Sequence, residues 1–228
     1  MQLVGDFNWI FCQIVCNLAA LPLYMNLNSS PFWLRALFPK GLVWSIPVNR
    51  PEIFLTFDDG PVPEVTPMVL TILRKYNVKA TFFCVGENVQ KYPEIYEMLA
   101  KEGHITGNHT FHHIKAWKMP HSDFLSEVEQ CSLLVKSRLF RPPHGQINRK
   151  LARLLHPDYK IIMWSALSCD YDMKLSGIQC LTNAIQHTFP GAIIVFHDSI
   201  KARERMLYAL PLYIEHCLGK GYSFRTLE

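Results

Sequence analysis

The sequence predicts a single α/β domain folded as an irregular (β/α) barrel of about seven strands. Two observations predict this class. After Arg50, short apolar runs alternate with amphipathic stretches of helical spacing, which is typical of βα units and a parallel sheet. Polar clusters also follow the apolar runs, as expected at the carboxyl ends of parallel strands. An open doubly wound sheet is the alternative.

The predicted strands are apolar runs rich in β-branched and aromatic residues. The first of them ends where Gly60-Pro61 forces the chain to turn. In chain order, the predicted strands are Ile53–Phe57, Ala80–Val85, His104–Gly107, Leu139–Arg141, Lys160–Trp164, Ala192–Phe196 and, weakest, Ser223–Arg225.

The predicted helices carry apolar residues at intervals of three and four, as Val65, Val69 and Leu73 do in the first. In chain order, they are Glu64–Tyr76, Tyr92–Glu102, Ser122–Ser137, Asn148–Leu155, Gly177–Thr188 and Ala202–Gly219. Long linkers, repeats and low-complexity segments are absent from the sequence, so one domain accounts for all these units.

The composition favours a large core and disfavours nucleic-acid binding. Of the 228 residues, 49% are hydrophobic and 18% are charged, and the formal net charge is +4. The Lys and Arg residues are scattered rather than gathered in a run or stripe. We expect residues 51–228 to form the domain, 29–50 a lead-in and 1–28 an apolar N-terminal segment. The oligomeric state is not predicted.

The N-terminal segment has three interpretations. Trp9–Met25 is largely apolar, but it is short for a membrane span and contains Gln13, Asn17 and Pro22. It could be a weak membrane anchor, a helix packed on the domain, or sequence upstream of a start at Met25. The seven cysteines form no CxxC pair, which indicates reduced core thiols and favours a cytoplasmic location. A peripheral or anchored position at the membrane is the alternative.

Two adjacent carboxylates, Asp58 and Asp59, follow the first predicted strand. Like charges at a strand end repel each other, and burying either one is unfavourable unless it is paired. A metal ion or an arginine usually provides that compensation. Four further polar clusters follow later strands, at 108–113, 141–145, 170–172 and 197–198. Five clusters at one end of a sheet predict a functional site.

The first candidate within that site is a metal centre. His109 and His113 are four residues apart, and on a helical turn they would face the same way. With Asp59 they would supply two nitrogens and one oxygen and leave positions open, as catalytic zinc sites do. His112 would point away from that face. Exposed histidines of a surface helix are the alternative interpretation.

The remaining candidates suit acid–base chemistry. Arg141 is the expected partner of Asp58, which its charge would keep ionised. The Pro-Pro turn after it predicts an extended backbone, whose N–H near His144 could stabilise an oxyanion. His197 ends an apolar strand and is a candidate general acid, with Asp170 to orient it. A surface arginine and a buried core histidine are the alternatives.

These residues resemble, in this order, the polysaccharide deacetylases of the NodB-homology family, carbohydrate esterase family 4. The resemblance covers about Ile53 to Phe224, and the first two motifs are the most specific. The matching motifs are Thr56-Phe57-Asp58-Asp59-Gly60-Pro61, Gly107-Asn108-His109-Thr110 through His113, Arg141-Pro142-Pro143-His144-Gly145, Trp164-Ser165 to Asp170-Tyr171, and Val195-Phe196-His197.

The resemblance implies roles for the motif residues, and the sequence departs from the family pattern at three of them. It implies Asp58 as base, His197 as acid and a substrate pocket that includes Pro143, Tyr171 and Val195. His144 stands where relatives carry Tyr or Trp. Tyr171 replaces the usual Trp, and Leu167 replaces an Asp. These departures bear on the substrate more than on the reaction.

The resemblance thus implies a metal-dependent hydrolase in residues 51–228 that removes N-acetyl groups from GlcNAc-containing glycans. Zn²⁺ is the favoured ion, with Co²⁺ or Ni²⁺ as alternatives. Three rival functions remain: hydrolysis of another non-peptide amide, a non-haem Fe(II) oxygenase, and a catalytically silent glycan-binding domain. The oxygenase is disfavoured because it would need none of the acid–base residues.

Overall fold

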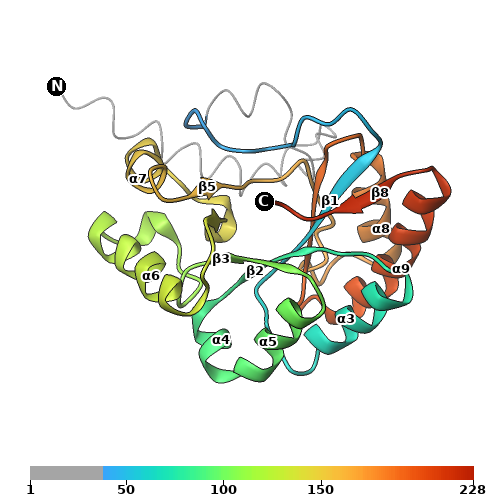
Figure 1. Ribbon diagram of the computed structural model, residues 1–228, viewed down its shortest axis with the longest axis horizontal. Coiled ribbons are helices and arrows are strands. Elements are labelled where there is room, and N and C mark those ends of the chain that lie inside the picture. The colour runs from blue at the N-terminus through green and yellow to red at the C-terminus, as the bar shows by residue number, and fades with distance from the viewer. Residues whose placement is uncertain (1–37) are drawn as a thin grey trace.

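The computed structural model describes residues 38–228, and their centre is a curled parallel sheet surrounded by helices (Figure 1). The strand order across this sheet is β5-β4-β3-β2-β1-β7-β6, and β8 pairs with β1. The strands are β1 (Glu52–Asp58), β2 (Thr81–Cys84), β3 (Ile105–Asn108), β4 (Leu139–Phe140), β5 (Lys160–Ile161), β6 (Ala166–Leu167), β7 (Ile193–His197) and β8 (Ser223–Arg225). The predicted irregular barrel is confirmed.

The helices lie outside the sheet, between consecutive strands (Figure 1). They are α3 (Thr66–Lys75), α4 (Gly86–Lys91), α5 (Pro93–Lys101), α6 (His121–Leu134), α7 (Arg149–Leu155), α8 (Gly177–Gln186) and α9 (Arg203–Gly219), with 3₁₀ turns η2 (Ala116–Lys118) and η3 (Pro143–Gly145). All six predicted helices are present. β6, α4 and the two 3₁₀ turns were not predicted from the sequence.

The core lies on both faces of β1, because that strand is central in the sheet. Leu55 and Phe57 are fully buried in the apolar cluster that also contains residues of α3 and α9. The Phe57 ring stacks on Phe82 of β2 at a centroid distance of 4.9 Å. On the other face, Phe54 packs with Phe83 and the C-terminal Leu227. The central strands are therefore held rigidly from both sides.

The register of β1 and β7 determines how Asp58 and His197 lie relative to each other. β1 and β7 pair in parallel from Phe54 opposite Ile193 to Asp58 opposite His197. The polar residues at both strand ends therefore emerge side by side. This is the edge at which parallel βα folds place reactive groups.

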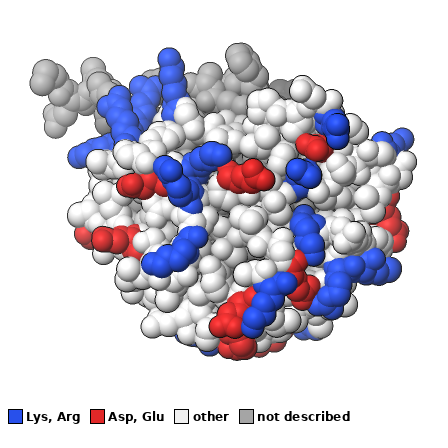
Figure 2. All heavy atoms as spheres, viewed as in Figure 1, with Lys and Arg blue, Asp and Glu red and all other residues white. Residues whose placement is uncertain are grey.

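Surface charge, membrane-spanning helices and the state of the cysteines were also considered in the sequence predictions. Acidic and basic side chains are interspersed on the face shown in Figure 2. Within residues 38–228, every helix is too short or too polar to cross a membrane. The cysteines described there are buried, as predicted for core thiols; they are Cys84, Cys131, Cys169, Cys180 and Cys217. Cys12, Cys16 and the segments 1–28 and 29–37 lie outside the described residues.

Candidate active site

The five predicted polar clusters meet at the carboxyl ends of the strands. Asp58 ends β1 and Asp59 follows it, the histidine loop follows β3, and Arg141 follows β4. His197 ends β7. Asp170 follows β6, not the preceding strand as expected, because the two-residue strand β6 lies between them. The structure thus brings together every residue proposed for the chemistry.

A buried ion pair joins Asp58 to Arg141. The Arg141 Nη1 lies 2.6 Å from Asp58 Oδ1 and 2.8 Å from the hydroxyl of Thr56, and Nη2 donates to the Met163 carbonyl. The guanidinium also lies 4.1 Å from the centre of the Phe83 ring. Burial lowers the pKa of Arg141, and the charge and hydrogen bond of Asp58 oppose that shift. Arg141 therefore holds the Asp58 side chain in one fixed orientation.

Asp59, His109 and His113 form a cluster that suits a metal ion. One ligand atom from each lies within 4.8 Å of the others. Asp59 Oδ1 lies 3.2 Å from His113 Nε2 and 3.8 Å from His109 Nε2. His109 donates its Nδ1–H to the Arg141 carbonyl at 2.7 Å, so its Nε2 lone pair faces the cluster. Burial and the nearby His113 lower the pKa of His109 well below its usual value, which keeps the ring neutral.

The histidines converge through an irregular loop, and the predicted helical turn at 109–113 is wrong. Thr110 and His113 have positive φ angles of 63° and 53°, which no α-helix contains. The Asn108 side chain accepts the Thr110 N–H at 2.9 Å and donates to the Val128 carbonyl, so it anchors this loop on α6. Two left-handed residues bring the rings together where helical spacing was expected to do so.

His112 lies outside the cluster, as predicted. Its side chain is 49% exposed and pairs with Glu127 at 2.8 Å. It therefore provides an internal control for any experiment on the histidine loop.

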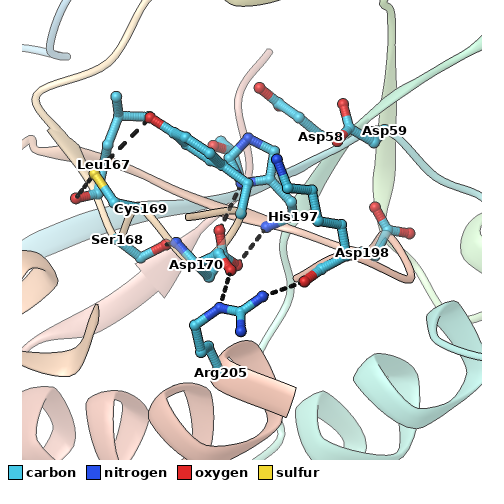
Figure 3. Close-up of polar contacts among 12 residues, drawn as sticks. Asp58, Asp59, Leu167, Ser168, Cys169, Asp170, His197, Asp198 and Arg205 are labelled. Atoms are coloured by element: carbon cyan, nitrogen blue, oxygen red, sulfur yellow. Dashed lines mark hydrogen bonds and ion pairs between the residues drawn. The ribbon is translucent and has the colours of Figure 1, made fainter. Parts of the chain in front are cut away.

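His197 is paired with Asp170 beneath the site (Figure 3). The carboxylate of Asp170 contacts His197 Nδ1 at 2.7 Å and accepts the backbone N–H of His197 at 2.8 Å. Burial alone would lower the pKa of His197, but the charge and hydrogen bond of Asp170 outweigh it and raise that pKa to about 9. The ring therefore carries a proton at neutral pH.

The His144 turn differs from the extended backbone that was expected. Residues 143–145 form the 3₁₀ turn η3, in which His144 and Gly145 have φ angles of 57° and 66°. The N–H groups of Gly145 and Gln146 donate back within the turn, to Pro142 and Pro143. Of this turn, His144 is therefore the residue whose N–H remains the candidate oxyanion donor. Its ring lies 4.6 Å from that of His113.

The three residues predicted to line a substrate pocket differ in exposure. Tyr171 is partly exposed and meets the His197 ring edge-on at 5.0 Å. Pro143 and Val195 are buried. Any contact of these two residues with substrate would therefore be at the floor of the site and not at its rim.

Three buried or partly buried polar residues around the site had no role predicted from the sequence. Thr56 accepts from Arg141 and donates to the Ile194 carbonyl. Arg205 donates its Nε–H to the Asp170 carbonyl at 2.7 Å (Figure 3). Asp198 is 1% exposed, and burial raises its pKa to about 7. The sequence could have indicated two of them, because Thr56 is a polar residue inside an apolar strand and Asp198 directly follows one.

Comparisons with known proteins agree with this geometry. Residues 45–157 match the sequence profile of the polysaccharide deacetylases. A peptidoglycan-N-acetylglucosamine deacetylase of Bacillus cereus is 34% identical over 202 residues, covering 85% of this chain and 95% of the relative. A chitooligosaccharide deacetylase of Azorhizobium caulinodans is 31% identical, covering 82% and 98%. The crystal structure of the Bc1960 peptidoglycan N-acetylglucosamine deacetylase superposes with a TM-score of 0.79 at 31% identity, covering 86% of this chain and 94% of that chain.

Proposed function

The chain belongs to the polysaccharide deacetylase family, and we propose that it hydrolyses the N-acetyl groups of GlcNAc-containing glycans with the help of a divalent metal ion. The observation that carries this proposal is the meeting of three sets of groups in one site. They are an arginine-paired carboxylate, a cluster of two histidines and a carboxylate, and a protonated histidine. Together they provide a base, a metal site and an acid.

The donor set of the cluster fits a metal ion. Asp59, His109 and His113 offer one carboxylate oxygen and two imidazole nitrogens, which favours Zn²⁺, with Co²⁺ or Ni²⁺ as alternatives. When bound, such an ion would act as a Lewis acid toward the acetamide carbonyl and would lower the pKa of water in the site toward ~7.

Asp58 is the proposed base. It accepts a proton from the attacking water as the water oxygen bonds to the carbonyl carbon. Arg141 pairs with this carboxylate and fixes its orientation for the step. The backbone N–H of His144 donates to the carbonyl oxygen as negative charge develops on it.

His197 is the proposed acid. The C–N bond breaks with release of acetate, and the departing nitrogen needs a proton to leave as an amine. His197 supplies that proton, and Asp170 keeps the ring charged and oriented. Tyr171 packs edge-on against the same ring and is the proposed contact for the sugar. The relatives named above act on peptidoglycan or chitooligosaccharide, and both classes are candidate substrates.

Two rival functions make different predictions. A non-haem Fe(II) oxygenase could use the same three ligands, but its activity would depend on O₂. A silent glycan-binding domain would bind oligosaccharide without releasing acetate. The complete acid–base set disfavours both.

The deciding experiment measures acetate release from N-acetylated chitooligosaccharides and from peptidoglycan fragments. The protein is assayed as purified, after chelation, and after Zn²⁺ is added back, with Asp58→Asn as the matched control. We expect release that chelation abolishes, that Zn²⁺ restores and that the variant lacks. If the metal-loaded protein released no acetate from either substrate, the proposal would be wrong, and another amide or a binding role would take its place.

A further inference from the structure

We propose that Asp198 is a positioning residue that holds Asp59 in the conformation the metal cluster requires. This inference rests on the proposed role of Asp59 as a ligand. Asp59 has a φ of 82°, in the left-handed region that side chains other than glycine rarely adopt. Such a conformation persists only where the surrounding structure enforces it. The groups that enforce it at Asp59 are therefore part of the metal site.

Asp198 brackets Asp59 from both sides along the chain. Its backbone N–H donates to the carbonyl of Asp58 at 3.1 Å, just before Asp59. Its carboxylate Oδ1 accepts the N–H of Gly60 at 3.1 Å, just after Asp59. One residue directly after β7 thus fixes both peptide groups that flank Asp59.

The second carboxylate oxygen extends the same hold to the rest of the loop. Oδ2 accepts the hydroxyl of Thr66 at 2.6 Å, and that hydroxyl accepts the N–H of Val62 at 2.7 Å. The loop between β1 and α3 is therefore tied to β7 at three points. From the other side, the Asn88 amide donates to the Asp59 carbonyl at 2.8 Å.

Asp198 packs against the loop so closely that there is no room for a side chain on Gly60. A Cβ placed on Gly60 would lie 1.9 Å from Asp198 Oδ2, so the loop backbone rests directly against the carboxylate. Figure 3 shows Asp170 beside His197, and Asp198 on the side of Asp59. The adjacent residues His197 and Asp198 would thus support opposite halves of the site.

The test is the affinity of the full-length protein for Zn²⁺. Bound metal is first removed by chelation, and Zn²⁺ is then titrated in competition with a chromophoric chelator. In Asp198→Asn the side chain keeps its size but loses its charge, and presents an N–H₂ group to Gly60 or Thr66. We expect Zn²⁺ affinity to fall about 10- to 100-fold, as for other residues that orient metal ligands. Asp198→Ala, which removes both acceptor atoms, should lose at least as much affinity if it folds.

Thr66→Val removes one of the three ties of Asp198 and leaves the Gly60 contact in place, so it should lower Zn²⁺ affinity less than Asp198→Asn does. His112→Ala is the matched control, because His112 lies outside the cluster and its loss should leave Zn²⁺ affinity unchanged. If Asp198→Asn bound Zn²⁺ as tightly as the wild type, Asp198 would be a stabilising residue only, and the inference would be wrong. If the wild type itself bound no Zn²⁺, the proposed metal site would fail as well, so the two failures are distinguishable.

Discussion

The two halves of the candidate site are built differently. The acid–base half, Arg141 with Asp58 and Asp170 with His197, lies at strand ends and is buried, with Arg141 and Asp170 fully inaccessible. In the ligand half, the Asp59 and His113 side chains are 26% and 31% exposed. Both of these residues have left-handed backbone conformations in loops.

Under the proposed function, this difference separates the half that would hold an ion from the half that would not. In the acid–base half each charge already has a partner within 2.7 Å, so these ion pairs preorganise it. In the ligand half a carboxylate faces two imidazole nitrogens, and its geometry depends on loop contacts. Mutations should therefore separate catalysis from metal binding cleanly.

The largest expected effect comes from breaking the acid–base half alone. Asp58→Asn and His197→Ala should each reduce turnover by about 10²- to 10⁴-fold, because each removes one proton-transfer group. Zn²⁺ affinity, measured by competition titration, should stay close to wild type. Near-normal turnover in either variant would contradict the role given to that residue.

Arg141→Met tests whether the acid–base half is also structural. The substitution leaves the Asp58 carboxylate buried beside Thr56 without its cation. We expect the free energy of unfolding in urea to fall by about 3–5 kcal/mol. A protein as stable as the wild type would show that solvent or rearrangement compensates Asp58.

Much of the fold and most of the site could be predicted from the sequence, because long central strands carry a clear composition signal. The two residues of β6 are too few to show any periodicity, and α4 buries only Gly86 and Val89. The histidine loop was misjudged because spacing of four suits a helix, whereas two left-handed residues produce the same convergence. The proposed role of Asp198 could not be predicted, since its carboxylate accepts a backbone N–H 138 positions away in the sequence.

A smaller effect should follow from weakening the His197–Asp170 pair. Burial lowers the pKa of His197, but the charge and hydrogen bond of Asp170 outweigh burial and raise this pKa from about 6.5 to about 9. Asp170→Asn removes that charge, so the alkaline limb of the turnover–pH profile should move to lower pH. An unchanged limb would assign it to another group.

The same pair makes stability depend on pH in a defined direction. Because the folded-state pKa of His197 lies above its unfolded value, the pair stabilises the wild type fully below pH of about 6.5, and this contribution is lost as pH rises through about 9. The free energy of unfolding of Asp170→Asn should lack this dependence.

The smallest expected effect is that of His112→Ala, which tests whether specific rings of the histidine loop bind the metal. His112→Ala removes an exposed side chain paired with Glu127, and should leave turnover and Zn²⁺ affinity unchanged. His113→Ala, one residue away, should lose more than the roughly 10- to 100-fold in affinity expected for a supporting residue. Equal effects of the two variants on Zn²⁺ affinity would mean that the loop, not a specific ring, determines binding.

The pairing of β1 with β7 has a consequence for how the chain folds. β1 lies between β2, which follows it closely in sequence, and β7, which is made well over a hundred residues later. During synthesis, the edge of this strongly apolar strand that pairs with β7 therefore stays unpaired until β7 has been made. Unpaired strand edges favour misassembly. The contacts that complete the site are thus among the most non-local in the chain, and non-local contacts slow folding. Activity should consequently be the last property that a refolding chain recovers.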